Sequence, residues 1–228
     1  MTASKISVKD LIKILEKKRK KGKNQYIIFD IDDTIIDTTK RKEEVYKRIK
    51  SNNKLPDLFP DEFRTSYNII ELLKNKNFDE NSLIKANNNF LKYFLSNEYL
   101  KYDSQFPGVE KVIYKLSGIG FKIIYLTGRH YDMFEGTMES FKMNNIPIDN
   151  ENIELVMKKD FYLSDIDFKK NFINNFDKKN NIICIIDNDS ETCNELGLLV
   201  NDDTLIIKFN STQKDSIKFN GFHLNNWN

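Results

Sequence analysis

The chain has 228 residues, of which 39% are hydrophobic, enough to bury a core and to exclude a disordered or fibrous protein. Lysine and arginine number 36 and aspartate and glutamate 34, so the net charge of +2 neither demands nor excludes a nucleic-acid partner. No run approaches the about 18 apolar residues of a membrane span, and no secretory signal is visible. Two cysteines are too few for a disulfide framework or a zinc site. We expect a soluble, cytoplasmic protein without a membrane partner.

The first predicted element is an amphipathic helix. Apolar residues at helical spacing over 8–15 lead into a basic run at 17–21. Because cations near the carboxyl end of a helix are stabilised by its dipole, this run has a structural explanation. A nucleic-acid patch is the less favoured alternative.

Short apolar runs, continuous rather than alternating in polarity, recur along the chain. They cover residues 26–29, 121–126, 153–157, 182–186 and 205–209. This character is typical of strands buried on both faces of a parallel sheet. Helical patterns separate the later runs, so the sequence predicts an α/β fold with a doubly wound parallel sheet. In such folds ligands bind at the carboxyl ends of the strands.

The segment between the first predicted strand and the helix before the second is far longer than a crossover connection requires. Residues 38–105 carry helical patterns of their own. We predict that they form a mainly helical cap, inserted after the first core strand into a core of residues 1–37 and 106–228. Asp61 and Asp79 are predicted to cap helices in this segment. Its aromatic residues are predicted to form mainly its own core: Phe63, Tyr67, Phe90, Tyr93 and Phe94.

The polar residues that follow these strands carry the chemistry. The first strand runs into residues 30–34 (Asp-Ile-Asp-Asp-Thr), the second into 127–129 (Thr-Gly-Arg), and the fourth into 187–189 (Asp-Asn-Asp). Because parallel strands end at one edge of a sheet, these groups are predicted to share one crevice. Lys169, early in the helix before the fourth strand, is expected to reach it.

The charges in this crevice indicate a metal. Asp30, Asp32 and Asp187 would bring up to three negative charges together, an arrangement that needs a hard cation among them. Carboxylates and a backbone carbonyl around an open position suit Mg²⁺, which favours a phosphate oxygen as a further ligand. Lys169 and the Thr127 hydroxyl would then bind the phosphoryl oxygens. These residue types favour phosphoryl transfer.

In this order, the motifs resemble the four motifs of the haloacid dehalogenase (HAD) superfamily of phosphatases. They span residues 26–190, which is most of the chain outside the predicted cap. The Asp-x-Asp-x-Thr pattern alone is a moderately specific signal for this superfamily. The full set of motifs, in this order and at the ends of predicted strands, is a strong signal for it. The resemblance implies a Rossmann-like HAD core and a Mg²⁺ cofactor. The segment 126–169 is also similar to the phosphatase half of polynucleotide kinase-phosphatases and to small acid-phosphatase-like members.

The resemblance implies two catalytic carboxylates. Asp30 would attack phosphorus and form an aspartyl-phosphate. Asp32 would protonate the leaving oxygen and then take a proton from the hydrolytic water, while its backbone carbonyl binds the metal. Branches of the superfamily that preserve the phospho-aspartate or attack carbon lack this acid. Its presence favours a phosphatase or a phosphotransferase.

The remaining implied roles concern binding. Thr127 would bind a phosphoryl oxygen, with Gly128 and Arg129 beside it in the substrate site. Lys169 would neutralise the transferring phosphoryl group. The metal ligands would be Asp30, Asp32 and Asp187.

Several assignments stay open at the level of sequence. Lys170 directly follows Lys169, and only one of the two can face the crevice. Many relatives have an acidic residue where this chain has Asn188, so the roles of Asn188 and Asp189 are undetermined. His130 is interpreted as a structural hydrogen-bonding residue. Residues 220–228 are predicted to be a polar tail without chemistry.

The sequence therefore predicts a Mg²⁺-dependent phosphatase that hydrolyses small phosphomonoesters. The alternatives are a phosphotransferase and a polynucleotide end-phosphatase that use the same site, although a nucleic-acid substrate is not favoured. A receiver-type phospho-acceptor switch is a further alternative, but in that class the phosphorylated Asp lies on a later strand and no cap is inserted. The oligomeric state is not predicted.

Overall fold

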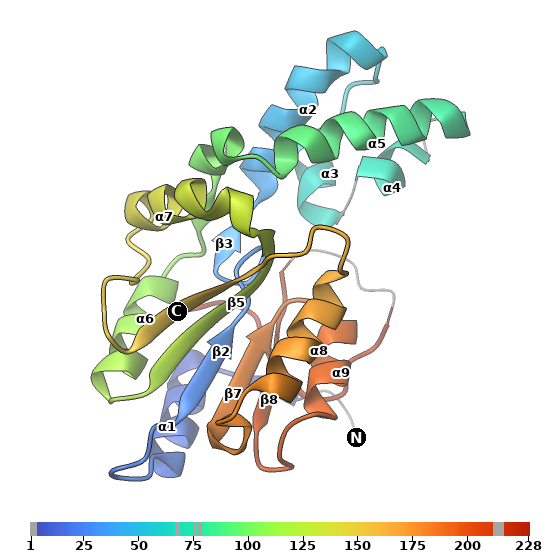
Figure 1. Ribbon diagram of the computed structural model, residues 1–228. Helices are drawn as coiled ribbons and strands as arrows, with labels where there is room; N and C mark the ends of the chain where they lie inside the picture. The colour runs from blue at the N-terminus through green and yellow to red at the C-terminus, as the bar shows by residue number, and fades with distance from the viewer. Residues whose placement is uncertain (1–3, 67–68, 75, 77–78, 212–216) are drawn as a thin grey trace.

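The computed structural model describes residues 4–66, 69–74, 76, 79–211 and 217–228. Within these residues, seven strands form one parallel sheet in the order β1-β9-β8-β7-β2-β5-β6 (Figure 1). Their bounds are β1 Ser4–Ile6, β2 Tyr26–Phe29, β5 Lys122–His130, β6 Ile153–Lys158, β7 Ile182–Asp187, β8 Leu205–Phe209 and β9 Phe222–Leu224. The predicted doubly wound parallel sheet is confirmed.

Helices cover both faces of the sheet because side chains along its strands alternate in direction. Ile27 and Phe29 of β2 join a cluster that includes residues of α1, α6 and α7. Tyr26 and Ile28 join a second cluster on the other face, with residues of α8 and α9. The bounds of these helices are α1 Val8–Lys18, α6 Val109–Gly118, α7 Phe134–Met143, α8 Asp165–Asn175 and α9 Ser190–Gly197.

Strand β2 lies in the middle of the sheet and delivers the first polar motif. It pairs in parallel with β5 on one side and β7 on the other, with Phe29 in register with Tyr125 and Ile186. The Asp30 N–H then donates to the Ile186 carbonyl at 2.9 Å. Hydrogen bonding on both sides fixes where the strand ends, and therefore where Asp30 lies.

A helical segment lies between two short antiparallel strands, β3 Ile36–Asp37 and β4 Ser104–Gln105. Figure 1 shows it beyond the end of the sheet to which β2 and β5 run. It has its own hydrophobic cluster, separate from the two clusters on the sheet. Its helices are α2 Thr39–Asn53, α3 Pro60–Thr65, α4 Ile69–Lys74, α5 Glu80–Phe94 and the 3₁₀ helix η1 Asn97–Tyr102. We call residues 38–105 the inserted segment.

Two helix starts in the inserted segment were predicted. Asp79 is the N-cap of α5, and its side chain accepts a hydrogen bond from the Ser82 N–H. Asp61 is not a cap, because Pro60 occupies the first turn of α3 and moves the N-cap back to Phe59. Of the aromatic residues, Phe63 and Phe90 are buried in the segment's cluster and Tyr93 and Phe94 pack against it, while Tyr67 lies outside the described residues.

The prediction for residues 220–228 was wrong. Phe222–Leu224 form β9, which extends the sheet between β8 and β1. Trp227 is buried, because it packs against aromatic rings at the ends of β2 and β8. No helix in the described part of the chain is long and apolar enough to cross a membrane.

Candidate active site

The loop after β2 shapes the first part of the site. Asp30 is buried, and the Thr34 hydroxyl donates to its Oδ2 at 2.9 Å. The backbone turns sharply here, with Asp33 at a φ of 57°. Asp33 Oδ1 accepts from the Thr38 N–H and hydroxyl, and Asp33 Oδ2 accepts from Lys42. This loop therefore ties the start of α2 to the end of β2.

Lys169 joins the first and last motifs. It is buried in α8, and its Nζ donates to Asp30 Oδ1 and to Asp187 Oδ2, at 2.7 Å each. Burial and the charge of Asp187 raise the pKa of Asp30 to about 7, although Lys169 opposes this shift. Burial lowers the pKa of Lys169, but the attraction of Asp187 and Asp30 outweighs it and keeps the ammonium charged. Lys170, by contrast, donates to Glu195 on α9.

The second motif lies at the end of β5. Thr127 is buried, and its Oγ1 accepts from the Arg129 N–H at 3.1 Å. At Gly128 a Cβ would overlap the carboxyl group of Asp165, so a larger residue there would displace this side chain at the start of α8. Asp165 in turn accepts from Lys158 at 2.6 Å. The close packing brings Thr127 and the first turns of α8 to one cavity.

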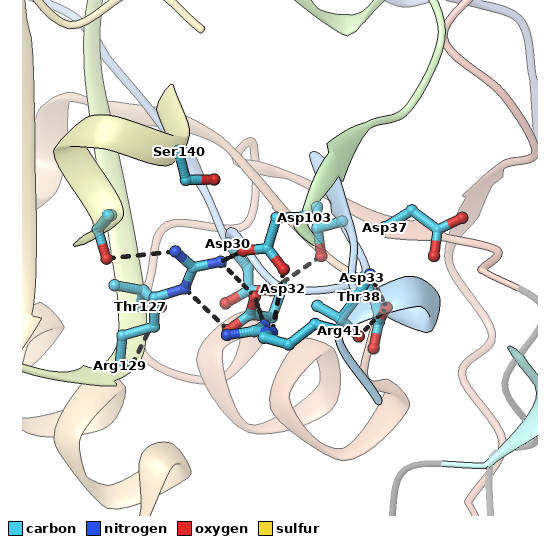
Figure 2. Close-up of polar contacts among 12 residues, drawn as sticks. Asp30, Asp32, Asp33, Asp37, Thr38, Arg41, Asp103, Thr127, Arg129 and Ser140 are labelled. Atoms are coloured by element: carbon cyan, nitrogen blue, oxygen red, sulfur yellow. Dashed lines mark hydrogen bonds and ion pairs between the residues drawn. The ribbon is translucent and has the colours of Figure 1, made fainter. Parts of the chain in front are cut away.

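Asp32 faces two arginines, as Figure 2 shows. Arg129 donates to both of its oxygens, from Nη2 to Oδ1 at 2.6 Å and from Nε to Oδ2 at 3.0 Å. Arg41, from α2 of the inserted segment, donates to Oδ1 at 2.5 Å. Burial by itself would raise the pKa of Asp32, but the two guanidinium groups outweigh it and hold the pKa well below its usual range.

A second carboxylate completes this cluster. Asp103, next to β4, accepts from Arg129 Nη2 at 2.7 Å and pairs with Arg41 Nε at 3.0 Å. Two buried arginines and two carboxylates thus balance in charge where the inserted segment meets the sheet. Phe94 covers the guanidinium of Arg41, with 4.2 Å between its ring centroid and Cζ. We call Asp32, Arg41, Asp103 and Arg129 the charge cluster.

Sequence reasoning missed Arg41, Asp103 and Thr34 as site residues. Arg41 lies in a basic stretch of a helix, and Asp103 precedes a strand of two residues, so neither carries a local signal. Thr34 is part of the first motif, and its position alone could have identified it.

The residues after β7 have separable roles. Asn188 Oδ1 lies 3.2 Å from the Thr34 hydroxyl and shares its single proton with the nearer Asp30 Oδ2, so Asn188 contacts the loop that holds Asp30. Asp189 is the N-cap of α9, and its Oδ2 accepts from the N–H and hydroxyl of Thr192. His130 binds the Lys159 carbonyl through Nε2 and the Asp132 N–H through Nδ1, in keeping with the predicted structural role.

The motifs converge on a cavity of about 560 Å³. The sheet side contributes Asp30, Thr127, Lys169 and Asp187, and the inserted segment contributes side chains of mixed chemistry. The latter are Lys42, Glu71, Phe94 and Leu95. The cavity lining has eight acidic side chains and three basic ones, so it suits a cation, or an anion that binds together with a cation.

The donor set at the floor of the cavity fits a hard cation. In the described part of the chain no three Asp, Glu, His or Cys side chains converge as a metal site. The donors are instead two carboxylates, Asp30 and Asp187, both within hydrogen-bond reach of one ammonium. Both oxygens of the Asp32 carboxylate accept hydrogen bonds from arginines, so its backbone carbonyl is the candidate ligand. Oxygen donors with few protein carboxylates are typical of Mg²⁺, which retains several waters.

Comparisons with known proteins show a family and a fold. The family model of haloacid dehalogenase-like hydrolases matches residues 27–147. No curated protein matches the chain in sequence.

Three similar solved structures share the fold at low identity. A predicted phosphatase from Clostridium acetobutylicum has a TM-score of 0.64 at 16% identity, covering 89% of this chain and 94% of its own. A predicted phosphoglycolate phosphatase from Haemophilus somnus has a TM-score of 0.64 at 10% identity, and the match covers 90% of this chain and 95% of that protein. Protein Tyrosine Kinase A from Mycobacterium tuberculosis has a TM-score of 0.62 at 12% identity, and the match covers 90% of this chain and 94% of that protein. The family model matches more than half of the chain, so the chain belongs to the haloacid dehalogenase-like hydrolases.

Proposed function

We propose that the protein is a Mg²⁺-dependent phosphatase that hydrolyses phosphomonoesters through an aspartyl-phosphate on Asp30. One observation supports this most: Lys169 bridges Asp30 and Asp187 in a cavity that Thr127 also lines. A nucleophile, a phosphate-binding cation and a hydroxyl donor are the groups that phosphoryl transfer needs.

The reaction proceeds in two steps. A carboxylate oxygen of Asp30 attacks phosphorus, the ester P–O bond breaks, and Asp32 gives a proton to the departing oxygen. Water then attacks phosphorus and loses a proton to Asp32, and the bond from phosphorus to Asp30 breaks to release phosphate. Lys169 and Thr127 hold the phosphoryl oxygens in both steps, with Gly128 and Arg129 lining the same part of the cavity.

Asp30, Asp187 and the backbone carbonyl of Asp32 would hold Mg²⁺. When bound, the ion neutralises phosphoryl oxygens and makes phosphorus more electrophilic. The same charge offsets the burial of Asp30, so the carboxylate stays ionised for attack.

Asp32 has to lose an arginine partner and take up a proton before it can act as an acid, because the two guanidinium groups hold its pKa well below its usual range. Both of its oxygens accept from Arg129, and Oδ1 also accepts from Arg41. Arg41 belongs to the inserted segment, so a movement of that segment changes the environment of Asp32. We infer that residues 38–105 act as a cap that admits substrate, excludes water and adjusts the catalytic acid.

The substrates are expected to be small soluble phosphate esters of the cytoplasm. The cavity volume of about 560 Å³ matches such molecules, and the net charge of +2 gives no general attraction for nucleic acid. One protein of similar fold is named as a kinase, so transfer to alcohol acceptors is a second outcome to measure.

A substrate panel tests the proposal. Sugar phosphates, phosphorylated carboxylic acids, nucleotides and oligonucleotide ends are assayed for released phosphate with Mg²⁺ and with a chelator, in wild type and Asp30→Asn. We expect hydrolysis of small esters that needs Mg²⁺ and is lost in Asp30→Asn, with the fold unchanged by circular dichroism. Metal-independent hydrolysis, or an active Asp30→Asn, contradicts the proposal.

A further inference from the structure

Trp227 lies behind the loop that carries the nucleophile. It is the only tryptophan of the chain, is 2% exposed, and stands between the exposed Asn226 and Asn228. Its ring stacks on Phe209 with centroids 5.3 Å apart and contacts Phe29 at 5.8 Å. Phe29 directly precedes Asp30, so Trp227 packs against the last residue of β2.

A hydrogen bond connects Trp227 to the other side of the nucleophile. Trp227 Nε1 donates to the backbone carbonyl of Thr34 at 3.0 Å, and the Thr34 hydroxyl donates to Asp30 Oδ2 at 2.9 Å. Trp227 therefore contacts the segment 29–34 at both ends, while Asp30 lies between the two contacts.

The indole N–H of Trp227 is a hydrogen-bond donor to a buried backbone carbonyl of this loop. The N–H groups of Thr34, Ile35 and Ile36 all donate to the Ile31 carbonyl, so the turn is closed on itself. The Thr34 carbonyl points out of this turn and accepts from Trp227, in a fully buried environment. A buried carbonyl without a donor is unfavourable, so without the indole the loop would rearrange to find one.

We propose that Trp227 is a positioning residue for the nucleophile. It fixes the Thr34 backbone and, through the Thr34 hydroxyl, the carboxylate of Asp30. This inference rests on the proposed function, because it takes Asp30 as the group that attacks phosphorus. Small displacements of a nucleophile lower the rate of the chemical step more than they weaken substrate binding.

Trp227→Phe tests the proposal, because it keeps an aromatic ring and removes the N–H. Tyr125→Phe is a matched control: its buried hydroxyl donates to the Pro147 carbonyl at 2.8 Å, so it also removes one buried donor to a backbone carbonyl. We expect similar decreases in Tm, a fall in kcat of about tenfold for Trp227→Phe only, and little change in KM for both. Wild-type kcat in Trp227→Phe, or an equal fall in Tyr125→Phe, overturns the proposal.

Fluorescence gives a second test that needs no folded variant of Trp227. Emission of the wild-type protein comes from this single tryptophan, and Mg²⁺ with fluoroberyllate mimics the phosphorylated carboxylate. Fluorine NMR reports whether the fluoroberyllate is bound. We expect binding to change the emission of wild type and to have no effect in Asp30→Asn.

The outcomes of this second test separate the two proposals. Bound fluoroberyllate with unchanged emission overturns the role of Trp227 and leaves the proposed function standing. No bound fluoroberyllate, together with no hydrolysis of any ester, overturns the proposed function itself.

Discussion

The carboxyl group of Asp32 lies between two guanidinium groups, and this environment controls its chemistry. Arg129 is held by the core, where it also donates to Thr137, whereas Arg41 is carried by the inserted segment. We therefore regard Arg129 as the fixed partner of Asp32 and Arg41 as the movable one.

Replacing Asp32 tests its role as the acid. We expect Asp32→Asn to lower kcat by about 10²-fold for alkyl phosphates, whose leaving oxygen needs a proton. For an aryl phosphate with a good leaving group the loss should be much smaller. Steady-state kinetics on both ester classes checks this, and equal losses would argue against the acid role.

Removing Arg41 tests the link between the inserted segment and the acid. We expect Arg41→Met to lower kcat more for alkyl than for aryl phosphates, and to destabilise the fold by about 3 kcal/mol because buried Asp103 loses an ion pair. Arg48→Met is the control: Arg48 is exposed on the same helix and lies over the Tyr93 ring at 5.7 Å, so its loss should affect both ester classes equally and destabilise the fold by at most about 1 kcal/mol. Identical losses on both ester classes would show a structural role alone.

The sequence identified the groups at the carboxyl ends of strands, because the end of a strand fixes the position of the side chains there. Asp30 directly follows β2, Asp187 is the last residue of β7, and Thr127 lies in the last part of β5, which continues to His130. The sequence did not identify Arg41 or Asp103, since their positions depend on how the inserted segment packs against the sheet. The choice between Lys169 and Lys170 likewise required the orientation of α8.

At the scale of elements, α9 starts shortly after Asp187, one of the proposed metal ligands, and its first turn needs a cap. Asp189 provides it through Thr192. We expect Asp189→Ala to lower the free energy of unfolding by about 1 kcal/mol and to leave Mg²⁺ affinity nearly unchanged. Asp189→Ser, which keeps a capping oxygen, should restore stability. Chemical denaturation and Mg²⁺ titration measure both, and loss of Mg²⁺ affinity in Asp189→Ser would make Asp189 a ligand.

The strands of four residues or more could be predicted because each is a continuous apolar run, whereas the three-residue strands β1 and β9 could not. β1 and β9 have three residues each, and β9 contains His223 between two apolar residues. Such short segments carry no periodicity that separates them from a loop. The same limit hid the structural role of Trp227, which depends on a contact 193 residues away along the chain.

For the whole molecule, the order of strands explains how distant motifs meet. β7, β2 and β5 are neighbours in the sheet, so the residues that follow them share one edge. The inserted segment has a separate hydrophobic cluster and contacts the site through the charge cluster. The residues proposed for the chemistry therefore lie on the sheet side, and the inserted segment reaches them through Arg41 and Asp103.

The central claim is that Asp30 becomes phosphorylated during turnover. Borohydride reduces an aspartyl-phosphate to homoserine, so enzyme trapped during hydrolysis of a good substrate can be digested and analysed by mass spectrometry. We predict homoserine at position 30, formed only with substrate and Mg²⁺ present. Continued hydrolysis with an unmodified Asp30, or a label on another residue, would contradict the account.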